Sequence, residues 1–116
     1  MTFELFKKLM SFDTKENLCI EIFFIVQGSN KFNSCWMGKM PNKATKVDMF
    51  WFGLTSDGKN AYDYSTFEEF SFAKIFDGKS LFEIWDNISI VDINGCDPID
   101  MIEMYLSGGG GLEAPQ

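Results

Sequence analysis

Residues 18–27 read LCIEIFFIVQ, and this stretch decides the fold. β-Branched and aromatic residues fill it, as is typical of a strand, and turn-forming residues follow at 28–31. Further runs of the same kind lie at 32–40, 47–55 and 60–64, separated by short polar connections. Short connections favour antiparallel pairing, so the sequence predicts an antiparallel meander over 18–64.

Helix signals lie on both sides of the meander. Residues 3–10 carry an apolar stripe at helical spacing, and capping signals at 65–69, 80–83 and 97–98 each predict a further helix. The β-branched run at 88–93 predicts one more strand. We therefore expect an α+β fold: a mostly antiparallel sheet of four to five strands, with about four short helices packed mainly on one face.

Length and composition limit the function. The 116 residues fit one domain over 1–106, followed by a flexible glycine-rich tail at 107–116. The chain has no His, and all ten of its basic residues are Lys. It therefore lacks the side chain that usually serves acid–base catalysis and metal binding near neutral pH. A net charge of −7 also opposes binding to a nucleic-acid backbone. We expect no enzyme, no metal, no cofactor and no nucleic-acid partner.

The cysteines and the lengths of the apolar runs indicate the cellular compartment of the protein. Cys19, Cys35 and Cys96 are odd in number and widely spaced, which favours free thiols in a reducing compartment. The N-terminus does not resemble a signal peptide, and no apolar run approaches the roughly 18 residues of a membrane span. We expect a cytoplasmic protein without membrane contact. Abundant Lys and Asn without Arg indicate a bacterial, AT-rich genome.

Hairpin loops at 28–31, 41–46 and 56–59 predict which side chains face one another. They place Phe23 opposite Trp36, Trp36 opposite Trp51, and Trp51 opposite Tyr64, as one aromatic row across the sheet. The same face should also carry a rim of smaller and polar residues: Glu21, Ser34, Gly38, Gly53 and Tyr62. The opposite face is almost entirely apolar, and we expect it to form the core.

Two interpretations of the aromatic face remain open at this point. A helix or the C-terminal segment covers it as ordinary core, or it is a binding surface, because Trp and Tyr are enriched at binding hot spots. The second interpretation predicts a non-catalytic protein-interaction domain of inhibitor, immunity or adaptor type, working as a homodimer or with another protein. The alternative is a small-molecule module in which Gly38 and Gly53 open a pit beside Trp36 and Trp51. Least favoured is a carboxylate enzyme using Glu21 or Asp63.

Overall fold

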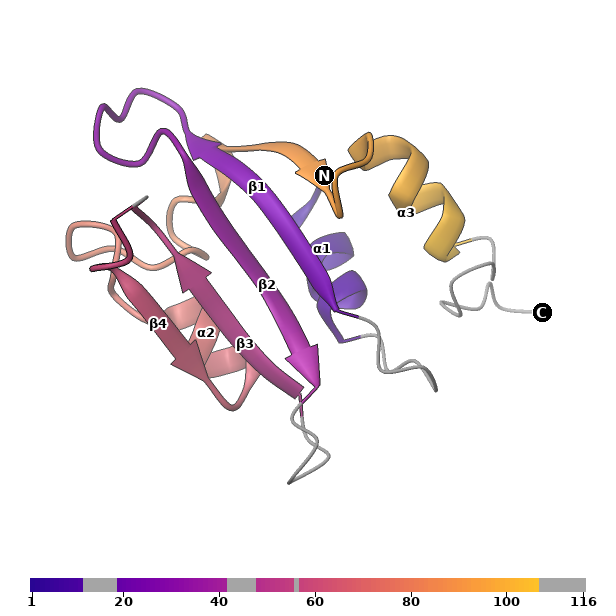
Figure 1. Cartoon of the computed structure of the whole chain (residues 1–116), viewed down its shortest axis with the longest axis horizontal. Coiled ribbons are helices and arrows are strands. Elements are labelled where there is room, and N and C mark those ends of the chain that lie inside the picture. The colour runs from indigo at the N-terminus through magenta and orange to yellow at the C-terminus, as the bar shows by residue number, and fades with distance from the viewer. Residues whose placement is uncertain (12–18, 42–47, 56, 107–116) are drawn as a thin grey trace.

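The stretch 18–27 provides one inner strand of the sheet. A computed structural model describes residues 1–11, 19–41, 48–55 and 57–106. Five strands form one open, wholly antiparallel sheet in the order β4-β3-β2-β1-β5 (Figure 1). Their bounds are β1 Ile20–Val26, β2 Cys35–Pro41, β3 Asp48–Gly53, β4 Ala61–Tyr64 and β5 Ile88–Ile93. The predicted α+β class and antiparallel sheet are confirmed.

Three α-helices occur in the described ranges, rather than the expected four: α1 Phe3–Met10, α2 Phe67–Phe72 and α3 Pro98–Leu106. Each begins where a cap was predicted. Thr2 Oγ1 accepts from the backbone N–H of Leu5 at 3.1 Å, and Thr66 Oγ1 accepts from that of Glu69 at 3.1 Å. At the third helix, Asp97 Oδ1 accepts from the Ile99 N–H at 2.9 Å. These bonds satisfy N–H groups that a helix leaves free at its start.

The prediction that a helix opens at 80–83 and runs to about residue 86 is wrong, although its capping box forms. Ser80 N–H donates to Glu83 Oε1 at 3.1 Å, and Glu83 N–H donates to Ser80 Oγ at 3.2 Å. The chain then makes only turns and a short 3₁₀ helix, Trp85–Asn87. The reason is that Asn87 O already accepts from Gln27 N–H at 2.8 Å, so β5 begins before an α-helix can develop.

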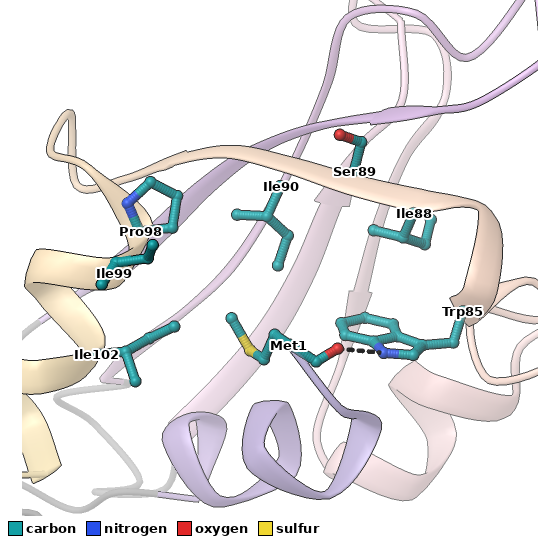
Figure 2. A pocket seen from close by; sticks show the side chains of 8 residues that line it. All are labelled: Met1, Trp85, Ile88, Ser89, Ile90, Pro98, Ile99 and Ile102. Atoms are coloured by element: carbon teal, nitrogen blue, oxygen red, sulfur yellow. Dashed lines mark hydrogen bonds between the residues drawn. The ribbon is translucent and has the colours of Figure 1, made fainter.

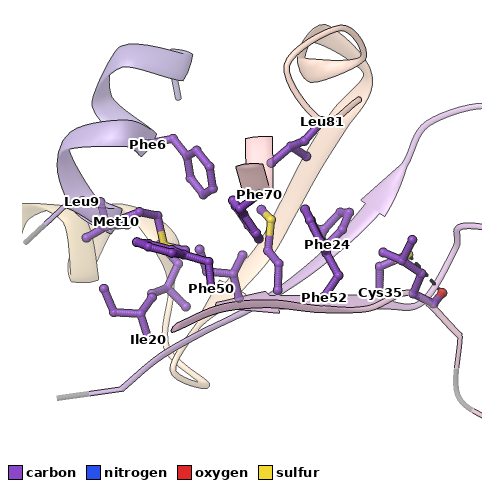
Figure 3. Close-up of a cluster of buried hydrophobic side chains, with 14 of the residues drawn as sticks. Phe6, Leu9, Met10, Ile20, Phe24, Cys35, Phe50, Phe52, Phe70 and Leu81 are labelled. Atoms are coloured by element: carbon purple, nitrogen blue, oxygen red, sulfur yellow. Dashed lines mark hydrogen bonds between the residues drawn. The ribbon is translucent and has the colours of Figure 1, made fainter. Parts of the chain in front are cut away.

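Helices α1 and α2 cover one face of the sheet, and the core lies between these helices and the strands (Figure 3). Phe70 of α2 stacks on Phe52 of β3 with ring centroids 4.1 Å apart, and Phe6 of α1 lies 4.6 Å from Trp85. Burying a phenylalanine side chain stabilises a fold by roughly 1.5–3 kcal/mol. We call this side the covered face and the other the open face, which is turned towards the viewer in Figure 1 with α1 and α2 behind the sheet.

The first predicted register is correct, and the second is shifted by two residues. Phe23 pairs with Trp36, but Trp51 pairs with Gly38 rather than Trp36. The shift arises because β2 continues through Pro41, which pairs with Asp48. Among the described residues, the pairing of β2 with β1 extends only to Lys39, so none of them needs the N–H that Pro41 lacks.

The third register is shifted by one residue. Leu54 N–H donates to Asn60 O at 3.0 Å, so Thr55 belongs to the turn instead of the strand. Its hydroxyl donates to Asp57 Oδ1 at 2.6 Å and accepts from Asn60 Nδ2 at 3.2 Å. An odd shift moves every side chain of a strand to the other face. All of β4 is therefore reversed relative to the prediction.

The predicted tail at 107–116 and most of the loop at 41–46 lie outside the described residues. Among the helices that the structure does describe, none has the length and apolar character needed to cross a bilayer.

Candidate interaction face

Two parallel rows of side chains cross the open face. The first row runs through β4, β3, β2 and β1 as Asp63, Trp51, Gly38 and Glu21. The second also reaches β5, as Ala61, Gly53, Trp36, Phe23 and Asp92. Neighbouring rows on one face of a sheet are roughly 7 Å apart, so the aromatic side chains of the two rows lie together. Each row is aromatic in the middle and carries a carboxylate at one end or both.

Phe23, Trp36 and Trp51 form the aromatic centre. The rings of Phe23 and Trp36 lie 5.0 Å apart at a tilt of 41°. Trp36 remains 40% exposed, and Met40 on the same strand remains 46% exposed. In the described ranges, α1 and α2 pack on the opposite side of the sheet, so these side chains meet solvent rather than a helix. Large exposed aromatic and apolar side chains gathered in one patch mark binding surfaces.

Each tryptophan pairs with a glycine on the neighbouring strand. Trp51 lies opposite Gly38, and Trp36 lies opposite Gly53. A Cβ added at Gly38 would stand 3.0 Å from Trp51 Cζ2, so the indole fills the space above that glycine. A Cβ added at Gly53 would meet only Trp36 Cβ, at 4.0 Å. The expected pit beside the tryptophans therefore does not exist at Gly38, while Gly53 leaves open space.

Carboxylates stand on both sides of the aromatic centre. Glu21 and Asp63 are exposed at opposite ends of the first row, separated by Trp51 and Gly38. Three strand spacings put their Cα atoms about 14 Å apart, so the two carboxylates do not form one close pair. Asp92 differs, because its Oδ1 is buried and has no hydrogen-bond donor among the described residues.

Two residues predicted on this face lie on the other one, and a third lies outside the strands. Tyr62 and Tyr64 point to the covered face, because the register of β4 is shifted by one. The Tyr64 ring lies 6.3 Å from Phe52, and burial raises the pKa of its hydroxyl, with a smaller contribution from Tyr62 and Glu69. Ser34 precedes β2 and is exposed. Glu21, Phe23, Trp36, Gly38, Trp51 and Gly53 share the open face as predicted.

The contribution of β5 to this face was not predicted from the sequence. The pairing of β1 with β5 changes between Phe23 and Phe24, which leaves Val91 as an extra residue. Such a bulge reverses the alternation of side chains. It turns Asp92 to the open face while Ile93 and Ile90 pack towards the core, and it leaves Val91 46% exposed. The poor alternation within 88–93 was the only signal in the sequence.

A cavity of about 310 Å³ lies on the other side of the sheet, between β5, α3 and the N-terminal residue (Figure 2). Aliphatic side chains from β5 and α3 point into it, and Trp85 Nε1 donates to the carbonyl oxygen of Met1 at 3.1 Å. None of the described residues that line it has a charged side chain. This cavity shares no residue with the aromatic rows.

Lys39 is the only lysine in the five strands, and it belongs to the covered face. It pairs with Ile20 and Phe50, is only 3% exposed, and its Nζ lies 3.0 Å from Asp48 Oδ2. The open face therefore receives no positive charge from the strands.

Within the same described ranges, no group of three His, Cys, Asp or Glu side chains is placed to hold a metal ion. The chain matches no family model, no curated protein and no solved structure.

Proposed function

We propose that this protein is a non-catalytic interaction domain that binds another protein through the open face of its sheet. The observation that carries the proposal is the position of Phe23, Trp36 and Trp51 on a face that neither α1 nor α2 covers. Tryptophan combines a large contact area with few rotatable bonds, so it binds at a low cost in conformational entropy. The rest of the fold is stabilised from the covered face, which leaves these side chains available for a partner.

The geometry favours a protein partner over a small ligand. Trp51 occupies the space over Gly38, so the face there is filled rather than hollow. Flat surfaces with a central aromatic cluster and a polar rim are typical of protein interfaces, whereas small molecules bind in concave sites. Three free cysteines support the assignment to a reducing compartment such as the cytoplasm.

The test is a selection from a displayed library of random dodecapeptides against the full chain. We expect the selected peptides to bind wild type and to lose at least about tenfold in affinity for Trp36→Ala, as truncated hot spots do. Phe82→Ala is the matched control, because Phe82 is similarly exposed at 48% but packs against Phe3, away from the open face. Peptides that bind Trp36→Ala as tightly as wild type would overturn the proposal. Thermal melts of both variants establish that they are folded.

A further inference from the structure

The charges around the aromatic centre identify the chemistry of the partner. Resting on the proposed function, we propose that the open face binds a cationic segment of another protein, in which Lys or Arg side chains flank apolar ones. The apolar side chains would contact Phe23, Trp36 and Trp51. The cationic ones would reach the carboxylates of Glu21, Asp63 and Asp92.

The first support is that every charged strand residue on this face is acidic. Glu21 and Asp63 end the first row, and Asp92 ends the second. Lys39, the one strand lysine, lies on the covered face beside Asp48, and Lys31 in the β1–β2 loop is bound to Asp77 at 2.9 Å. Complementary charges speed the encounter with the right partner and oppose the wrong ones. The aromatic faces add to this preference, because a cation over an indole is attracted by its π electrons.

The second support for a cationic partner is the buried carboxylate oxygen of Asp92. Its Oδ1 is buried beside Phe23 with no donor in the part of the chain that the structure describes. A buried acceptor without a donor costs free energy, so a rotation of the Asp92 side chain that brings Oδ1 to an incoming Lys or Arg would relieve that cost. The same carboxylates weigh against a second copy as the occupant, because a two-fold contact would bring two acidic rims together.

The test is calorimetric titration of the full chain with an octapeptide in which lysine alternates with leucine and phenylalanine. A matched octapeptide carries glutamate in place of lysine. We expect the lysine peptide to bind and the glutamate peptide to show no heat of binding. Failure of the lysine peptide to bind would overturn the proposal.

Two triple variants separate a local contact from the overall negative charge. E21Q/D63N/D92N neutralises the open face, and E4Q/E68Q/D86N removes the same number of charges from exposed positions outside the sheet. The first should weaken binding of the lysine peptide at least about tenfold, and the second by less than about threefold. Equal losses would mean long-range attraction only and would overturn the proposal. If D92N lowers the melting temperature, E21Q/D63N is compared instead with E4Q/E68Q, which also removes two charges.

The peptide selection distinguishes the two proposals. Selected peptides that depend on Trp36 but lack Lys and Arg would leave the interaction function standing and overturn the cationic partner. Peptides that do not depend on Trp36 would overturn both.

Discussion

Trp51 lies directly opposite Gly38 in the pairing of β3 with β2, and its indole covers the glycine. The Cζ2 atom is 3.0 Å from the position that a Cβ at residue 38 would take, and the carbonyl oxygen of Ile20 is 1.9 Å from it. Gly38 is thus closed in by a ring on one side and by the backbone of β1 on another. A strand glycine normally weakens a sheet, and a covering aromatic side chain compensates for the missing one.

Gly38→Ala tests this relationship. The new Cβ would clash with the backbone of β1, which cannot yield without disturbing the sheet, so we expect a loss of about 2–3 kcal/mol in the free energy of unfolding. Gly53→Ala is the control, because its Cβ would meet nothing closer than 4.0 Å and the residue has no positive φ. That variant should stay within about 1 kcal/mol of wild type. Urea unfolding measures both, and equal stability of the two variants would contradict the geometry.

Trp51→Ala and Trp36→Ala should differ in how much they destabilise the fold. Removing Trp51 uncovers the backbone at Gly38, so we expect it to cost about 2–3 kcal/mol of unfolding free energy. Removing Trp36 loses mainly its contact with Phe23, at a cost of about 1 kcal/mol. Guanidinium unfolding followed by circular dichroism measures which of the two variants loses more unfolding free energy. A larger loss for Trp36→Ala would show that Trp36, rather than Trp51, supports the sheet.

The accuracy of the sequence predictions followed the chemistry of each loop. The β1–β2 register was correct because its loop is closed by local signals: Ser29 Oγ accepts from the N–H groups of Lys31 and Phe32, and Gly28 has a φ of 81°. The β2–β3 register shifted by an even number, so Trp51 kept its predicted face although its partner changed. The β3–β4 register shifted by an odd number, which moved Tyr62 and Tyr64 to the core.

The remaining errors came from contacts distant in sequence. The capping box at Ser80 and Glu83 is local and was predicted, but the length of the element after it depends on where β5 meets Gln27. The bulge at Val91 depends on how β5 pairs with β1, and no residue near it in the chain specifies that pairing. Asp92 could therefore not be placed on the open face from the sequence.

The three thiols should react at different rates. Cys19 and Cys96 are exposed, whereas Cys35 is buried and its Sγ lies 3.4 Å from the carbonyl oxygen of Leu54. Burial raises the pKa of the Cys35 thiol, so it holds less of the reactive thiolate at neutral pH. Titration with an aromatic disulfide reagent should give two fast groups in the native protein and three in denaturant. Three fast groups in the native protein would contradict the burial of Cys35.

The acidic rim should also control self-association. An exposed aromatic face promotes contact between copies, and the carboxylates of Glu21, Asp63 and Asp92 oppose it because a two-fold contact would bring like charges together. We expect the wild type to sediment as a monomer at low ionic strength and to self-associate more strongly as added salt screens the carboxylates. E21Q/D63N/D92N should associate at least about tenfold more tightly than wild type at low salt, while E4Q/E68Q/D86N should behave as wild type. Adding Trp36→Ala to E21Q/D63N/D92N should abolish the increase in self-association, because the contact between copies would lose its exposed indole. A wild type that is already a stable dimer at low salt would show that the rim does not repel a second copy, and the face would then be the dimer interface.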